Sequence, residues 1–197
     1  MERKDALIHE VVERELTMFL SVPARTPVSC QQDPDGFRLM RTAQFSVWSE
    51  GTLASYRNDL EAAAAQSRNL MTLKYARMEG LIPELHNDIL VKNLIDQIVK
   101  IQLSWQQELN EKYPHLMRRG RPSTATATKD ETTSFSDYLR GELETYSSET
   151  LAFLYDDVSA AAARGKNMSE ALYVSMVAQL GYDSLDEAES MIASRRS

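Results

Sequence analysis

The sequence has little of what secreted, metal-binding or membrane proteins require. A single cysteine, Cys30, cannot form an internal disulfide and supplies no thiolate set for a structural zinc site. Three histidines are too few for a histidine-rich metal centre. No long apolar run could cross a membrane, and charges interrupt the apolar residues of the N-terminal stretch MERKDALIHE. We therefore expect a cytoplasmic protein without a disulfide or a membrane span.

Positive charge is also in deficit, since the formal net charge is −7. Binding to nucleic acid needs a basic surface that displaces counterions, and an acidic chain gains nothing from an anionic lipid surface. We expect neither nucleic acid nor membrane as a partner. The hydrophobic share of 43% and the length of 197 residues are typical of one globular domain, which we expect to span residues 1–197.

Glycine and proline are scarce, at seven and six residues, while good helix formers are plentiful. This composition predicts an all-α fold, a single-domain helical bundle of about seven helices. The first four predicted helices cover about Asp5–Leu20, Pro34–Trp48, Leu53–Glu79 and His86–Tyr113. Cap signals for later helices lie at Ser134, at Ser147 or Ser148, at Asn167 with Glu170 and at Ser184 with Glu187.

A long polar connector, about residues 114–133, separates the fourth and fifth predicted helices. Connectors of that length inside compact domains are usually functional or disordered. Its short basic run of arginines could bind a carboxylate or phosphate, or it could simply be solvated. No internal repeat is visible in the sequence.

Polar residues fall on the apolar faces of five predicted helices. A helix turns about 100 degrees per residue, so each side chain can be assigned to a face. In chain order, the residues on or beside the apolar stripes are Glu15; Arg41 and Gln44; Lys74 with Arg68 and Tyr75 at its edge; Glu108 and Lys112; and Glu142.

An isolated buried charge would cost several kcal/mol, so these groups must meet one another or line a wet cavity. The acidic members Glu15, Glu108 and Glu142 balance the basic members Arg41, Lys74 and Lys112. The pattern predicts a neutral ionic cluster at the centre of the bundle. In the alternative interpretation, long basic side chains reach water from an apolar face, and Glu108 with Lys112 is an ordinary surface pair.

Four segments resemble the bacterial family catalogued as domain of unknown function 4125: CQQDPDGFRLMRTAQFSVW, SYRNDLEAAAAQSRNLMTLKYARM, the Trp105–Pro114 stretch, and TSFSDYLRGELETYSSETL. The similarity runs from about Glu15 to LGYDSLDEAE. It implies no activity, but the family-like segments contain Cys30, Gln31, Arg41, Arg68, Asn69, Lys74, Tyr75, Glu108, Lys112, Tyr138, Arg140, Glu142 and Tyr146. The chain departs from the expected pattern in Gln66-Ser67 and Leu73, where a glycine and an acidic residue are expected.

One hypothesis is a cofactor-independent enzyme, such as a lyase, isomerase or condensing enzyme acting on an amino acid or a related anionic metabolite. Lys74 or Lys112 would act as base or nucleophilic amine, because a desolvated lysine loses basicity. Glu108 or Glu142 would exchange protons. Substrate-binding residues would be Arg41, Gln44, Arg68, Tyr75 and Glu15, and Cys30 is a possible nucleophile.

A variant of this hypothesis places a metal ion on the carboxylates of Glu15, Glu108 and Glu142, although the neighbouring positive charges oppose it. The second hypothesis is a non-catalytic interaction or regulatory protein in which the cluster fixes helix packing. The two differ in one structural respect: an enzyme would place Lys74 and its acidic neighbours around a solvent-accessible cavity, whereas a structural network would leave none.

Overall fold

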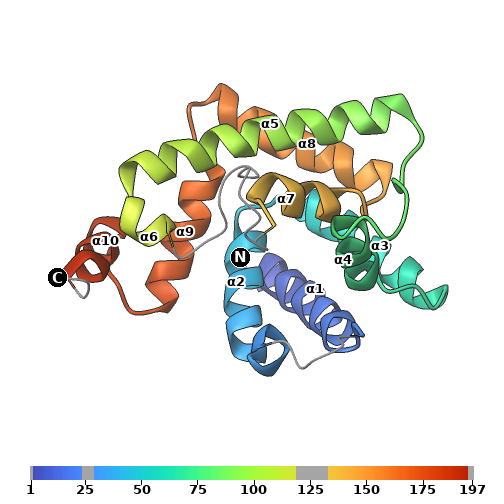
Figure 1. Cartoon of the computed structure of the whole chain (residues 1–197), viewed down its shortest axis with the longest axis horizontal. Helices are drawn as coiled ribbons and strands as arrows, with labels where there is room; N and C mark the ends of the chain where they lie inside the picture. The colour runs from blue at the N-terminus through green and yellow to red at the C-terminus, as the bar shows by residue number, and fades with distance from the viewer. Residues whose placement is uncertain (1, 24–28, 119–132, 195–197) are drawn as a thin grey trace.

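The computed structural model describes residues 2–23, 29–118 and 133–194, and this part of the chain is helical, with no strand (Figure 1). Its ten α-helices confirm the all-α class, but they exceed the predicted seven. They are α1 (Glu2–Leu20), α2 (Pro34–Ser46), α3 (Glu50–Ala65), α4 (Leu70–Met78), α5 (Ile89–Lys112), α6 (Pro114–Met117), α7 (Phe135–Leu143), α8 (Ser148–Ala163), α9 (Met168–Gln179) and α10 (Leu185–Ser194), with a 3₁₀ turn, η1 (Ser29–Gln32).

The predicted cap residues lie where later helices begin. Ser134, Ser147 and Asn167 each accept a hydrogen bond from the backbone N–H three residues further on. At the start of α10, Ser184 accepts one from the backbone N–H of Glu187. Such caps satisfy N–H groups that have no partner inside the helix, so the sequence fixes these boundaries locally.

The prediction of one helix from Leu53 to Glu79 was wrong, because the chain forms α3 and α4 with a break between them. Ser67 has a φ of 55°, in the left-handed region that ends a helix. Asn69 then caps α4 by accepting a hydrogen bond from the N–H of Thr72. The prediction missed this break because the apolar stripe continues in register from α3 into α4.

The connector also differs from its prediction. Pro114 opens the short helix α6 directly after α5, and Leu116 and Met117 are buried there. Residues 119–132 lie outside the described part of the chain.

Two apolar clusters hold the helices together. The larger is formed by buried side chains of α1 to α5, α7 and α8. The smaller joins the end of α5 to α6, α9 and α10, which gather at the left of Figure 1. The long helix α5 contributes to both clusters.

The structure reveals an internal repeat, contrary to the sequence-based expectation. The stretch SEGTLASYRNDLEAAAAQSRN, residues 49–69, matches SSETLAFLYDDVSAAAARGKN, residues 147–167, without a gap. The alignment continues from α4 into α9 and extends backwards from α3 and α8 into α2 and α7. LIHEVV in α1 likewise matches LIDQIV in α5. Helices α1, α2, α3 and α4 therefore correspond to α5, α7, α8 and α9.

Local geometry supports this correspondence. Helices α3 and α8 both end with a left-handed residue, Ser67 (φ 55°) in one and Gly165 (φ 64°) in the other. After each of these turns an asparagine caps the next helix, and its side-chain amide donates to a backbone carbonyl of the first helix of its half. Asn69 donates to Met18 at 2.7 Å, and Asn167 donates to Trp105 at 3.2 Å.

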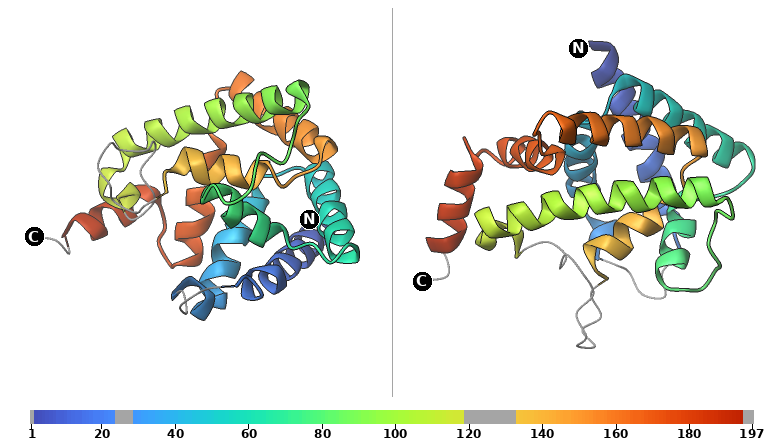
Figure 2. Two further views of the ribbon diagram at one scale, coloured as in Figure 1. Left: turned by 45° about the vertical axis from the view of Figure 1, so that its right-hand side comes forward. Right: turned by 90° about the horizontal axis from the view of Figure 1, so that it is seen from above.

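The two halves pack crosswise. Helices α3 and α8 lie side by side, and α4 packs on α7 as α9 packs on α2 (Figure 2). The side chain of Asp157 accepts from the N–H of Ser49 at 2.9 Å, and Asp59 accepts from the N–H of Ser147 at 2.9 Å. This exchange of equivalent contacts is what an approximate two-fold relation between the halves requires. The residues that match between the two halves are mainly helix caps, small residues and buried apolar residues, which are common in helical proteins and do not by themselves indicate a repeat.

Replacing Ser67 by glycine should stabilise the protein by up to about 1 kcal/mol, because glycine adopts a positive φ without a steric cost. Urea denaturation measures the change. Gly165→Ser is the matched control at the equivalent position, and it should destabilise by a similar amount. A loss of stability in Ser67→Gly would contradict this account of the break.

Candidate functional site

Four charged side chains from four helices meet inside the larger apolar cluster. They are Glu15 of α1, Arg41 of α2, Lys74 of α4 and Glu142 of α7, each at most 5% exposed. We call these four residues the ionic cluster. Two acidic and two basic groups make it neutral, so the predicted central ionic cluster exists, with a smaller membership.

Arg41 lies between the two carboxylates. Its Nε and Nη2 atoms donate to the two oxygens of Glu15, each at 2.5 Å, and Nη1 and Nη2 both donate to Oε1 of Glu142 at 3.0 Å. The planar guanidinium suits this arrangement because it presents several N–H groups in fixed directions. Arg41 thereby joins α1 and α2 to α7.

Lys74 brings in α4. Its Nζ atom donates to Oε2 of Glu142 at 2.5 Å and lies 3.6 Å from the ring centroid of Tyr138. The approach of α4 to α7 depends on Gly141, since a Cβ there would lie 2.6 Å from the side chain of Met78. A glycine beside Glu142 therefore permits the contact between the two charges.

Two tyrosines and a glutamine complete the hydrogen bonds of the cluster. The Tyr56 hydroxyl donates to Glu15 at 2.5 Å, and the Tyr146 hydroxyl donates to Glu142 at 2.7 Å. Gln44 accepts from Arg41 at 2.6 Å and donates to Glu142 at 3.1 Å. Sequence reasoning included Gln44 but treated both tyrosines as apolar. The available signal was that a buried tyrosine hydroxyl needs a polar partner.

The electrostatics of the cluster keep every charge in place. Burial by itself raises the pKa of the Glu142 carboxyl, but Arg41 and Lys74 outweigh burial and hold it well below its usual range. Burial lowers the pKa of the Lys74 ammonium and of the Arg41 guanidinium, yet the neighbouring carboxylates leave both pKa values raised. Burial, followed by the nearby carboxylates, raises the pKa of Tyr56 and Tyr146.

Every buried polar atom of the cluster has a hydrogen-bond partner. Among the buried side-chain nitrogen and oxygen atoms of the described residues, only Arg57 Nε and His115 Nδ1 lack one, and neither belongs to the cluster.

The predictions for α5 were wrong, since Glu108 and Lys112 are exposed and lie outside the cluster. Glu108 accepts a hydrogen bond from the Asn167 side chain at 3.0 Å, and Lys112 pairs with Glu170 at 2.8 Å. Both charges belong to the boundary between α5 and α9. On the helix wheel both residues are neighbours of the buried positions Trp105 and Leu109. The wheel alone therefore could not separate these exposed positions from the buried ones.

Two other predicted site residues take different places. Arg68 is exposed between α3 and α4. Half-buried Tyr75 lies at the edge of the cluster, with its ring centroid 5.8 Å from Lys74 Nζ and 6.4 Å from that of Phe19. No hydrogen bond joins Tyr75 to the four charges in the described structure. The side chain of Cys30 lies outside the described part, so its proposed role as a nucleophile stays a prediction.

The considered metal site does not form from Glu15, Glu108 and Glu142, because Glu108 is exposed on another helix while the other two are buried. Within the described ranges, no group of three or more metal-ligating side chains is placed to hold an ion. No helix in those ranges is long and apolar enough to span a membrane.

The internal repeat provides a comparison within the same chain. The positions equivalent to Arg41, Tyr56 and Lys74 are Leu139, Leu154 and Leu172. The equivalents of Glu15 and Glu142 are Gln102 and Gln44. The equivalents of the four charged residues are therefore all uncharged, two leucines and two glutamines.

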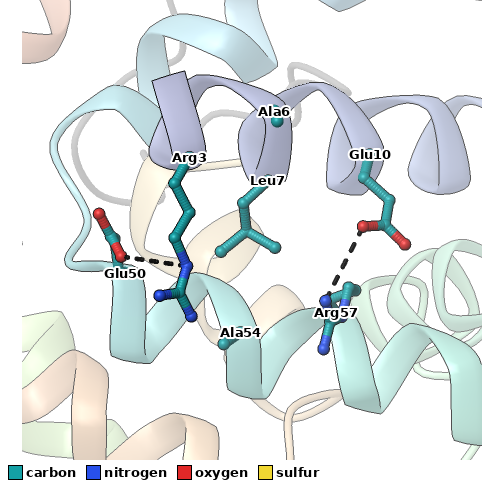
Figure 3. A pocket seen from close by; sticks show the side chains of 7 residues that line it. All are labelled: Arg3, Ala6, Leu7, Glu10, Glu50, Ala54 and Arg57. Carbon is teal, nitrogen blue, oxygen red and sulfur yellow. Dashed lines mark ion pairs between the residues drawn. The ribbon is translucent and has the colours of Figure 1, made fainter. Parts of the chain in front are cut away.

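Two hollows on the surface of the described residues are not lined by Glu15, Arg41, Lys74 or Glu142. The first is a groove of about 240 Å³ between α1 and α3, shown in Figure 3, with Ala6, Leu7 and Ala54 lining it between two loose ion pairs. These pairs, Arg3 with Glu50 and Arg57 with Glu10, have separations of 3.9 Å.

The second hollow, which we call the α3–α7 cleft, has a volume of about 310 Å³. Its walls come from α3, from the turn before α4, from the loop before α5 and from the turn between α7 and α8. Arg68 and Tyr146 both contribute to it. It therefore contains one predicted substrate-binding residue and one tyrosine that contacts the ionic cluster.

A family model described as "Protein of unknown function (DUF4125)" matches residues 5–190, nearly the whole chain. Comparison with curated proteins and with solved structures found no match. The match confirms the resemblance inferred from the sequence motifs.

Lys74→Met and Glu142→Gln should each destabilise the protein by roughly 3–5 kcal/mol, because either change leaves an unbalanced buried charge. The double variant restores neutrality, so its loss should be much smaller than the sum of the two. Chemical denaturation measures all three. Lys112→Met, which removes an exposed charge, is the control and should behave like the wild type. Additive losses would contradict the description of the cluster as one neutral unit.

The contribution of the cluster to stability should be constant between about pH 6 and 9. The Glu142 pKa is lowered from 4.5, so its contribution is present above that value and is lost as the pH falls below it. The Lys74 pKa is raised from 10.5, so its contribution is lost only as the pH rises above that value. Denaturation of wild type and of the Lys74→Met/Glu142→Gln variant across this range tests the expectation. A stability difference that changes near pH 7 would contradict it.

Proposed function

Because the chain belongs to the DUF4125 family, whose description assigns no activity, we propose a function from its geometry: a non-catalytic binding protein of the bacterial cytoplasm. In this proposal the ionic cluster fixes how the two halves of the repeat pair. One observation carries the proposal, the 2.5 Å contact between the Lys74 ammonium and the Glu142 carboxylate inside a buried and neutral network.

That contact is unfavourable for acid/base or lysine chemistry. A nucleophilic lysine must be partly neutral near pH 7, and a carboxylic acid that donates a proton needs a raised pKa. Here the Lys74 pKa is raised and the Glu142 pKa is lowered, each by the charge of its neighbour. Both shifts are opposite to those that the enzyme hypothesis requires.

The repeat gives the cluster a structural task. Glu142 comes from the second half, and its charged partners Arg41 and Lys74 come from the first. If uncharged residues stood at these positions in both halves, either half could pair with its counterpart in another molecule. Charges in one contact region and uncharged residues in the other make the two regions distinct, as buried polar groups do in some helical assemblies.

The proposal can be tested with the charge-balanced double variant Lys74→Met/Glu142→Gln, which keeps the pair of Glu15 and Arg41. Cells that express wild type, this variant or neither are compared by untargeted metabolite profiling. We expect no metabolite whose level depends on Lys74 and Glu142. A product that accumulates with wild type and not with the folded variant would overturn the proposal in favour of an enzyme.

Circular dichroism of the purified double variant establishes that it is folded. If it is not, Tyr146→Phe serves as the second variant, since it removes one hydrogen bond to Glu142 and leaves all four charges. In that case, a metabolite that changes with wild type but not with Tyr146→Phe, at equal amounts of folded protein, would equally overturn the proposal.

A further inference from the structure

The α3–α7 cleft contains two charged side chains without ionic partners. Arg68 makes no side-chain hydrogen bond or ion pair with any described residue, and Asp59 forms no ion pair within the same ranges. A third charged residue of the cleft, Glu144, is already neutralised, because Arg77 donates to both of its oxygens at 2.6 and 3.1 Å. The cleft therefore presents one available positive and one available negative charge.

Asp59 keeps hydrogen-bonding capacity after its structural contacts are made. Its Oδ2 atom accepts from the Ser147 N–H at 2.9 Å and from the Thr150 hydroxyl at 2.7 Å. Neither contact uses Oδ1. Both donors are uncharged, and the N–H lies at the N-terminus of α8, which favours a carboxylate. Asp59 therefore makes hydrogen bonds but no ion pair with a described residue.

His86 adds a further acceptor in the same cleft. Its Nε2 atom lies 3.0 Å from the carbonyl oxygen of Tyr146, and since a carbonyl only accepts, Nε2 carries the proton. In the neutral ring, Nδ1 is then an acceptor. The cleft thus combines two acceptors that suit an ammonium group, Asp59 and His86, with a guanidinium that suits a carboxylate.

The dimensions agree with a small ligand. The volume of about 310 Å³ is at the lower end of the range for small-molecule sites. Ala62, Ala63, Leu70 and Leu85 supply an apolar surface between the polar groups.

We infer that the α3–α7 cleft binds a small zwitterion of the amino-acid or dipeptide class, with its carboxylate on Arg68 and its ammonium on Asp59 and His86. This inference rests on the proposed function, for which it names the ligand class. A simple anion would leave Asp59 uncompensated beside it, and a simple amine would leave Arg68 unused. A zwitterion satisfies both charges at once.

The internal repeat provides matched controls for the test. Lys166 and Asp157 are equivalent to Arg68 and Asp59 in the second half. Asp157 also accepts from a helix-capping N–H and a threonine hydroxyl, at 2.9 and 2.6 Å. Neither Lys166 nor Asp157 lines the cleft. Asp59→Asn and Asp157→Asn both keep an oxygen for the two capping contacts while removing the charge.

The experiment is a titration of the full-length, isotope-labelled protein, followed by two-dimensional NMR. The probes are the individual amino acids, alanyl-alanine, acetate, methylamine and inorganic phosphate. We expect at least one amino acid or the dipeptide to bind and to shift resonances of cleft residues. Affinity should fall about tenfold or more in Arg68→Gln and in Asp59→Asn, as loss of one ion pair to a ligand predicts. Lys166→Gln and Asp157→Asn should retain wild-type affinity.

Three outcomes would overturn the inference: no binding by any zwitterion at millimolar concentration, binding of acetate, methylamine or phosphate as tight as that of the zwitterions, or equal losses in the cleft variants and their controls. The same samples are analysed for products. Turnover that disappears in the Lys74→Met/Glu142→Gln variant would overturn the proposed function while leaving the ligand class in place. Absence of both binding and turnover would overturn the inference and leave the proposed function standing.

Discussion

The structure depends on the neutralisation of one buried carboxylate. Glu142 lies at the centre of the larger apolar cluster and accepts hydrogen bonds from Arg41, Lys74, Gln44 and Tyr146. Without these partners the ionised form would be too costly to bury. Because the partners come from α2, α4 and the turn after α7, satisfying this one group determines how those segments are placed against one another.

The internal repeat explains why such a costly arrangement is not simply a feature of the fold. The equivalent positions of the other half hold leucines and glutamines, so related helices pack there without charges. Replacing buried ion pairs by apolar residues is often neutral or stabilising in other proteins. We propose that the charges distinguish the two surfaces through which the halves pair, which apolar packing alone would not do.

Much of the cluster could be predicted from the sequence because the rule involved is local. Glu15, Arg41, Lys74 and Glu142 each fall on the apolar stripe of their own helix, and a buried charge needs a partner of opposite sign. Glu108 and Lys112 satisfied the same pattern and were nevertheless exposed. They lie near the end of α5, where the neighbouring surface is provided by α9, and its polar residues Asn167 and Glu170 meet them at the surface. A helix wheel describes one helix and contains no information about what covers it.

By itself, the sequence determined the helical class, most of the later cap positions and the need for a neutral buried cluster, because these follow from composition, local hydrogen bonding and the cost of burying a charge. Only the tertiary structure decided which charges meet, that the hydroxyls of Tyr56 and Tyr146 donate hydrogen bonds to them, and how the two related halves pack against each other. Ser67 is an example, since a serine does not by itself indicate a positive φ. Its φ of 55° is seen in the structure, where it matches that of Gly165 at the equivalent helix end. Contacts between residues distant in sequence are fixed by packing, and periodicity within one helix does not encode them.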